Sequence, residues 1–146
     1  MRRHESLITL SREHHEGLII AQLIKKDAPV YFGLPSDVTG KSDYVVKFYY
    51  NNLKYHFEIE EEKLFPLVNN VDIKISSVIK ELIEEHKQII NFILTLKENK
   101  HDELLLNDLG VLLEKHIRKE ERVLFEMLQN KLNEDQLQKI KNVLSE

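Results

Sequence analysis

The chain contains one phrase twice, as His56-Phe-Glu-Ile-Glu60-Glu-Glu-Lys-Leu64-Phe65 and as His116-Ile-Arg-Lys-Glu120-Glu-Arg-Val-Leu124-Phe125. Five of the ten positions are identical, and they include a His, a Glu four residues later and a Leu-Phe pair four residues beyond that Glu. Four residues of an α-helix turn through about 400°, so the His and the Glu point about 40° apart and lie about 6 Å apart along the axis. Each phrase therefore predicts a helix on which a His and a Glu share one small volume.

Both phrases interrupt an apolar helical stripe. Leu53 and Leu64 share the face of the first phrase, and Leu113 and Leu124 share the face of the second. Burying a charged carboxylate in an apolar core costs on the order of several kcal/mol of folding free energy. A cation or a metal bound to the carboxylate compensates for this cost. No Lys or Arg shares either face, so the pattern favours a metal.

Two further histidines precede the two phrases. His86 lies on the most apolar stripe of the chain, and His14 shares a face with leucines; each directly follows a Glu, at positions 85 and 13. His15 is the alternative to His14, but its face also carries polar side chains. We favour His14 as the inward-facing residue.

The chain then divides into two helical hairpins of one design, each supplying Glu-His and His-x-x-x-Glu. Packed face to face, the hairpins would bring four imidazoles and two carboxylates together, and carboxylates can bridge two metal ions while imidazoles cap each one. Iron suits such a site best, with manganese or zinc as alternatives. The predicted metal ligands are His14, His56, Glu60, His86, His116 and Glu120.

The predicted fold is all-α: an up-down-up-down four-helix bundle with a short C-terminal closing helix, in a single domain over 1–146 whose ligand-bearing part covers about 10–131. We expect Ser42 or Asp43 to cap the second helix, after a long loop over 28–43, and Pro66 to kink that helix or end it near Phe65. Asn133 is the expected cap of the closing helix. The expected helices cover about 11–26, 44–68, 73–98, 103–131 and 134–144, and an earlier start of the first helix, which would include Leu7 and Leu10, is the alternative.

Composition excludes several other functions. The absence of Cys excludes disulfides, thiolate metal sites and a cysteine nucleophile. A net charge of −4 with interspersed Lys and Arg gives no basic surface for nucleic acid, and no apolar run is long enough for a membrane span. We therefore expect a cytoplasmic protein with neither nucleic acid nor membrane as a partner.

Three other residues need an interpretation. Glu61 and Glu121 each follow a predicted ligand by one position and point about 100° away from it, so we expect them to be solvated or paired with Lys or Arg. Tyr49 lies two turns before His56 on the same face. Its hydroxyl either reaches the metal site or, as the alternative, Tyr49 packs in the core.

The pattern Glu-His, His-Phe-x-x-Glu-Glu, Glu-His, His-x-x-x-Glu-Glu resembles that of the hemerythrin-like, or HHE cation-binding, family over Leu10 to Phe125. The resemblance implies a four-helix bundle with a carboxylate-bridged, non-haem di-iron centre that binds or senses dioxygen, and in some members deals with nitric oxide or oxidants. Carried over residue by residue, it implies the same six ligands.

The sequence departs from two branches of that family. Oxygen carriers have a second His one turn from that of the third helix, where this chain has Leu82 and Ile90, and an Asp five residues after the last His, where this chain has Glu121. The iron–sulfur repair branch carries a cysteine-bearing N-terminal segment, whereas this chain has no Cys. Neither function is therefore carried over.

Three hypotheses remain. The first is a non-haem di-iron protein, without catalytic residues, that binds or senses a small diatomic ligand such as dioxygen or nitric oxide, as a homodimer or with an unknown partner protein. The second is a di-iron redox enzyme in oxidant or nitric-oxide detoxification or in iron handling. The third is an inert bundle whose buried polar groups satisfy one another.

Overall fold

The computed structural model describes residues 2–146, and over that range it contains helices and their connections but no strand. Four long helices form the bundle, as predicted. The first is α1 (Ile8–Leu23) and the third is α5 (Ile73–Glu98). The second helix runs without a break through α2 (Val38–Phe48), η1 (Tyr49–Leu53), α3 (Lys54–Ile59), η2 (Glu60–Leu64) and α4 (Phe65–Val68). The fourth helix comprises α6 (Glu103–Lys119), η3 (Glu120–Leu124) and α7 (Phe125–Lys131), where η marks a π-helical turn.

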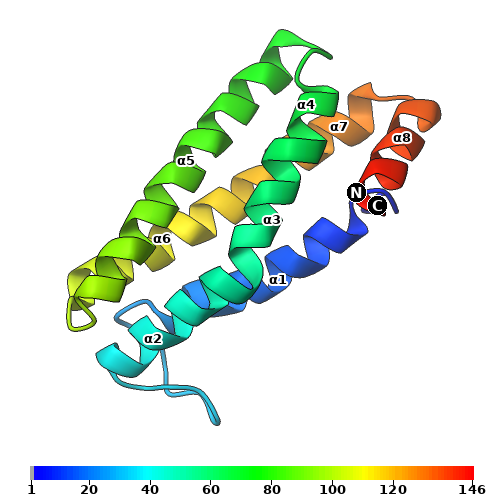
Figure 1. The fold of residues 1–146 in the computed structure, drawn as a ribbon. Helices are drawn as coiled ribbons and strands as arrows, with labels where there is room; N and C mark the ends of the chain where they lie inside the picture. The colour runs from blue at the N-terminus through cyan, green and yellow to red at the C-terminus, as the bar shows by residue number, and fades with distance from the viewer. Residues whose placement is uncertain (1) are drawn as a thin grey trace.

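The helices pack with α1 against α6 and with α5 against both α6 and α2. Figure 1 shows α5 beside the second helix, with α1 and α6 on the other side of the bundle. The closing helix α8 (Glu134–Leu144) begins with a capping box at Asn133, as expected, and lies beside the start of the chain, where Lys141 pairs with Glu5. No helix over 2–146 is both long and apolar enough to cross a membrane.

The start of the second helix differs from the prediction. The helix begins at Val38 after Asp37, so the expected loop over 28–43 is too long and neither Ser42 nor Asp43 is the cap. Ser42 is instead buried, and its hydroxyl donates to the Lys100 carbonyl. Gly40 allows this early start, because a Cβ there would come within 2.5 Å of an Asp37 side-chain oxygen. Packing against the third helix and its connection thus outweighs the low helix propensity of Gly.

Two π-helical turns begin at the two predicted glutamate ligands. In each turn an amide N–H donates to the carbonyl five residues earlier, from Phe65 to Glu60 and from Phe125 to Glu120. The first turn directly precedes Pro66, which has no N–H and crowds the preceding turn. The helix does not end there but continues to Val68. Single π turns inside α-helices occur frequently at functional sites.

Two apolar clusters fill the ends of the bundle. One lies beside α8 and includes Leu7, Leu64 and Phe125. The other lies toward the opposite end and includes Val45, Leu53 and Ile93. The repeated phrases place their polar residues along the helices between residues of these two clusters, so the bundle encloses a polar layer between two apolar cores.

Candidate metal centre

The structure brings all six predicted ligands together in that polar layer. All four long helices contribute ligands. The first helix carries His14 and the third carries His86. The second helix carries His56 and Glu60, and the fourth carries His116 and Glu120. The side chains are nearly inaccessible, with Glu60 and His86 0% exposed. His15, the alternative to His14, is exposed. We call this set the inner cluster: His14, His56, Glu60, His86, His116 and Glu120.

The inner cluster divides into two overlapping groups that share both glutamates. One group contains His14 and His56, the other contains His86 and His116, and within each group the possible ligand atoms lie within 4.8 Å of one another. Such overlapping buried groups are consistent with a dinuclear metal site.

Each shared glutamate aims one oxygen at each histidine pair. Oε2 of Glu60 lies 3.2 Å from Nε2 of His56, while its Oε1 lies 3.2 Å from Nε2 of His86. Glu120 repeats the arrangement, because its Oε1 lies 3.4 Å from Nε2 of His14 and its Oε2 lies 3.7 Å from Nε2 of His116. Both carboxylates are therefore oriented to bridge two cations.

Each of the four imidazoles directs its other nitrogen to a second carboxylate outside the inner cluster. Nδ1 of His56 lies 3.0 Å from Glu13, and Nδ1 of His116 lies 2.8 Å from Glu85. Nδ1–H then donates to the carboxylate, which fixes the tautomer and leaves the lone pair of Nε2 pointing into the cluster. Carboxylate–histidine pairs of this kind orient histidine ligands in metal proteins. We call the four second carboxylates the outer carboxylates: Glu13, Glu61, Glu85 and Glu121.

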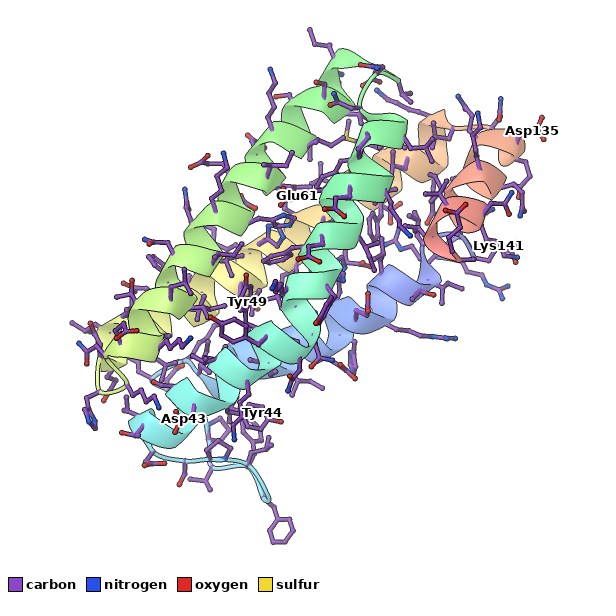
Figure 2. The ribbon with its side chains drawn as sticks, in the orientation of Figure 1. Asp43, Tyr44, Tyr49, Glu61, Asp135 and Lys141 are labelled. Atoms are coloured by element: carbon purple, nitrogen blue, oxygen red, sulfur yellow. The ribbon has the colours of Figure 1, made fainter. Side chains whose placement is uncertain are left out.

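The prediction that Glu61 and Glu121 are solvated or paired with Lys or Arg is confirmed, because Glu61 is 39% exposed and Glu121 pairs with Arg3, but it missed that each also contacts a histidine. Glu61 lies 2.6 Å from Nδ1 of His86, and Glu121 lies 2.6 Å from Nδ1 of His14, although Glu121 also pairs with Arg3. The rotation of about 100° from each ligand points these side chains toward the neighbouring helix while leaving both in partial contact with solvent. Figure 2 shows Glu61 on the side of the second helix that faces α5. The sequence did contain a signal for these contacts, because an acidic residue directly follows each of the two inner glutamates.

Burial and the neighbouring carboxylates oppose each other in setting the histidine pKa values. Burial lowers the pKa of His14, but the hydrogen bond to Glu121 and the nearby carboxylate of Glu60 raise it to about 9. Burial lowers the pKa of His116, and its bond to Glu85 does not offset that effect. Burial alone would raise the pKa of Glu60, but the charge of His56 and the close approach of three imidazoles hold it well below its usual range. Without a metal, ionised Glu60 therefore lies near a protonated His14, whereas the lowered pKa of His116 favours its neutral form.

Hydrogen bonds do not satisfy all the buried polar atoms of the inner cluster. Within residues 2–146, six buried side-chain atoms have no hydrogen-bond partner, and no Lys or Arg pairs with either shared glutamate. A buried carboxylate without partners is strongly unfavourable, whereas a metal bound to both oxygens removes that cost. The orphaned atoms thus fit a bound metal pair. They are both carboxylate oxygens of Glu60 and of Glu120, with Nε2 of His86 and of His116.

A family comparison agrees with this geometry: residues 7–128 match the model of the hemerythrin HHE cation binding domain. The chain belongs to the hemerythrin HHE cation-binding family. No curated protein and no solved structure matches the chain. The family resemblance inferred from the sequence is therefore confirmed, and with it the four-helix bundle.

Tyr49, by contrast, lies away from the inner cluster. It packs edge-to-face on Tyr50 with ring centroids 5.1 Å apart, in the apolar cluster that contains Leu53. Burial raises the pKa of its hydroxyl. Figure 2 shows Tyr49 and Glu61 at separate points along the second helix, with Tyr49 nearer its start. Among the described residues it makes no hydrogen bond to an inner ligand, so its surroundings favour the core-packing interpretation.

Proposed function

We propose that this HHE domain holds two iron ions and binds or senses a small diatomic ligand such as dioxygen or nitric oxide. The observation that carries the proposal is the orientation of Glu60 and Glu120, each of which gives one oxygen to each histidine pair. Two ions held by these residues would each have two imidazoles and two carboxylate oxygens. That leaves coordination positions open in an octahedral site.

Nitrogen and oxygen donors of this kind suit iron, with manganese and zinc as alternatives. Iron would supply open coordination positions and reversible one-electron chemistry for the small ligand. The chain's own residues orient the donors: the outer carboxylates hold the imidazole rings, and the two apolar clusters close the layer toward the two ends of the bundle. The proposal includes a cytoplasmic location. It also includes either a homodimer or a partner protein that responds to ligand binding.

The test is to load purified protein with ferrous iron without air, count the iron bound per chain, then admit oxygen and record the visible spectrum. We expect two irons per chain and a spectral change that His14→Ala abolishes. His15→Ala is the matched control, because it removes the adjacent but exposed imidazole.

The outcomes separate the hypotheses. Return of the ferrous spectrum when oxygen is removed supports binding or sensing, whereas lasting oxidation supports the redox-enzyme hypothesis. Failure to bind more than trace iron, manganese or zinc would overturn the metal proposal and leave the inert bundle.

A further inference from the structure

A groove of about 880 Å³ lies on the surface between α5 and the fourth helix. Its lining residues fall within 80–88 of α5 and within 112–123 of the fourth helix, and we call it the α5–α6 groove. At about 1.5 Å of rise per residue, the groove follows roughly 12 to 16 Å of the two helices. That length fits a segment of about two to three helical turns.

The α5–α6 groove contains cations that have no partner. Lys80, Lys115 and Arg122 line it, are exposed, and take part in no ion pair with any residue in the range 2–146. Over the same range, Glu84 is the one lining carboxylate without an ion pair. The groove therefore carries an excess of positive charge, although the whole chain has a net charge of −4.

Apolar side chains lie among these charges. Leu112 is half-buried and Val123 is 40% exposed, and both line the groove. Apolar surface between cations fits an amphipathic segment that presents apolar side chains on one face and carboxylates beside them. A nucleic acid fits less well, because the lining glutamates repel phosphates and a phosphate backbone has no apolar side chains.

The groove is linked to the metal centre through one of the outer carboxylates. Lys119 donates a hydrogen bond to Glu85 and lies 3.7 Å from Glu81, and all three line the groove. Glu85 in turn lies 2.8 Å from Nδ1 of His116, a residue of the inner cluster. A carboxylate that docks beside Lys119 competes with Glu85 for its ammonium group, and Glu85 orients the His116 ring.

We propose that the α5–α6 groove docks an acidic, amphipathic segment of a partner protein, and that Lys119 and Glu85 couple this docking to the metal centre. The coupling rests on the proposed function, whereas the docking is measurable without metal. Coupling between two sites is reciprocal, so a metal that changes the affinity for the segment is itself bound more or less tightly by the same factor.

The experiment measures the fluorescence anisotropy of labelled peptides of about three helical turns on the full chain. One peptide carries Glu and Leu at amphipathic helical spacing, the second has Lys in place of Glu, and the third has Ser in place of Leu. A single-stranded DNA of similar length tests the phosphate alternative. We expect the Glu-Leu peptide to bind about tenfold or more tightly than the other three probes.

Two pairs of substitutions test the charges of the groove. Lys80→Glu combined with Lys115→Glu should weaken the Glu-Leu peptide by about tenfold or more. Lys87→Glu combined with Lys139→Glu is the matched control, because it makes the same change of net charge at exposed lysines outside the groove. Circular dichroism checks the folding of each variant.

Two valines test the apolar part of the groove. Val123→Ser should weaken the Glu-Leu peptide by about threefold or more, because Val123 loses an apolar contact with the leucines. Val111→Ser is the matched control: Val111 is 42% exposed on the same helix but does not line the groove.

The coupling is measured by repeating the titration on protein loaded with ferrous iron without air. We expect the affinity for the Glu-Leu peptide to change by about fivefold or more, and Lys119→Met to remove this difference. Arg118→Met is the control, because it removes another lining cation that pairs with Glu114 rather than with Glu85. That variant should keep the dependence on iron.

The outcomes are separable. Tightest binding of the Lys-Leu peptide or of the DNA, or equal effects of the two lysine pairs, would overturn the docking. A dimer in sedimentation that Lys80→Glu with Lys115→Glu dissociates would assign the groove to a second copy and overturn the partner segment.

The metal dependence separates this inference from the proposed function. Equal peptide affinities with and without bound iron would overturn the coupling. Iron binding without peptide binding would overturn the whole inference and leave the proposed function intact. Peptide binding without iron binding would overturn the proposed function, and the coupling with it.

Discussion

The two helical hairpins carry the same donors but enclose them differently. In the first hairpin, residues 8–68, His14 and His56 border a cavity that reaches solvent. In the second, residues 73–131, His116 also lines that cavity, whereas His86 is fully buried beneath Phe57. Identical spacing of His and Glu therefore produces the same donor set twice, whereas access to each half depends on the side chains around it.

The outer carboxylates differ between the hairpins as well. Glu85 is 17% exposed and forms a hydrogen bond with Lys119 as well as with His116. Glu13 is 45% exposed, and among the described residues its only ionic partner is His56. The same Glu-before-His position thus gives a firmly held carboxylate in one hairpin and a loosely held one in the other.

The largest expected effect comes from the glutamates that both halves share. Glu120→Ala removes one oxygen from each half, so we expect the metal content to fall from two ions per chain toward none. His86→Ala removes a donor from the buried half alone, so about one ion should remain. Metal analysis after dialysis measures both. Retention of one ion by Glu120→Ala, with loss of both in His86→Ala, would contradict the shared-bridge geometry.

Outer carboxylates should have a smaller and unequal effect. Glu85→Gln should weaken metal binding about 10–100-fold, as is typical when the residue that orients a histidine ligand is removed. Glu13→Gln should weaken it less, because water can replace an exposed carboxylate at His56. Competition with a chromophoric chelator measures both affinities, with Glu84→Gln as the control. A larger loss of metal affinity in Glu13→Gln than in Glu85→Gln would show that the exposure of an outer carboxylate does not determine how much it contributes to metal binding.

The contact between the hairpins along α1 and α6 should respond to glycine substitutions. A Cβ on Gly110 would lie 2.8 Å from the Ala21 carbonyl oxygen, which is backbone and cannot move alone. A Cβ on Gly17 would instead meet the tip of the Ile117 side chain, which can rotate. We expect Gly110→Ala to lower the free energy of unfolding by about 1–3 kcal/mol, and Gly17→Ala to lower it less. Urea denaturation of the metal-free protein measures both, and equal losses would show that Ile117 is as rigid as the backbone.

The smallest expected effect concerns the helix starts. Asp72 caps α5 through a hydrogen bond from the Ile75 amide, whereas α1 has no side-chain cap at Leu7. A hydrogen bond from Lys131 lowers the pKa of Asp72 below its usual value. A lowered folded-state pKa stabilises the protein above the unfolded-state pKa, and this contribution disappears as the pH falls through the folded-state value.

Asp72→Asn keeps the cap acceptor but removes the charge. Wild type should therefore be more stable than this variant at neutral pH, and the gap should narrow as the pH falls below about 4. Thermal unfolding across that range measures the gap. A gap that is constant with pH would mean that the charge of Asp72 does not contribute.

The sequence predicted the inner cluster well because it depends on helical geometry alone. A His and a Glu four residues apart share a face whatever surrounds the helix, and the flanking leucines indicate that this face is buried. The third and fifth helices were also predicted with their observed bounds, because both are periodic stretches without Pro or Gly, and Asn133 marks the start of the fifth.

The features that were missed depend on neighbouring helices. Rotation about one axis indicates that Glu61 points away from Glu60, but not that His86 lies in that direction. The early start at Val38 depends on the contact of Ser42 with the Lys100 carbonyl. The cavity and the stacked Phe57 likewise arise from packing between helices, which one helical pattern does not encode.

The π turns at Glu60 and Glu120 have a consequence for redesign of this bundle. A π turn contains one more residue than an α turn, and an α-helix advances about 100° per residue. Forcing each turn into α geometry at unchanged length would make both helices regular, but it would rotate Phe65 and Phe125 by about that angle out of the apolar core beside α8. A designer who idealised these helices would therefore keep the donors before each turn and misplace the aromatic residues after it.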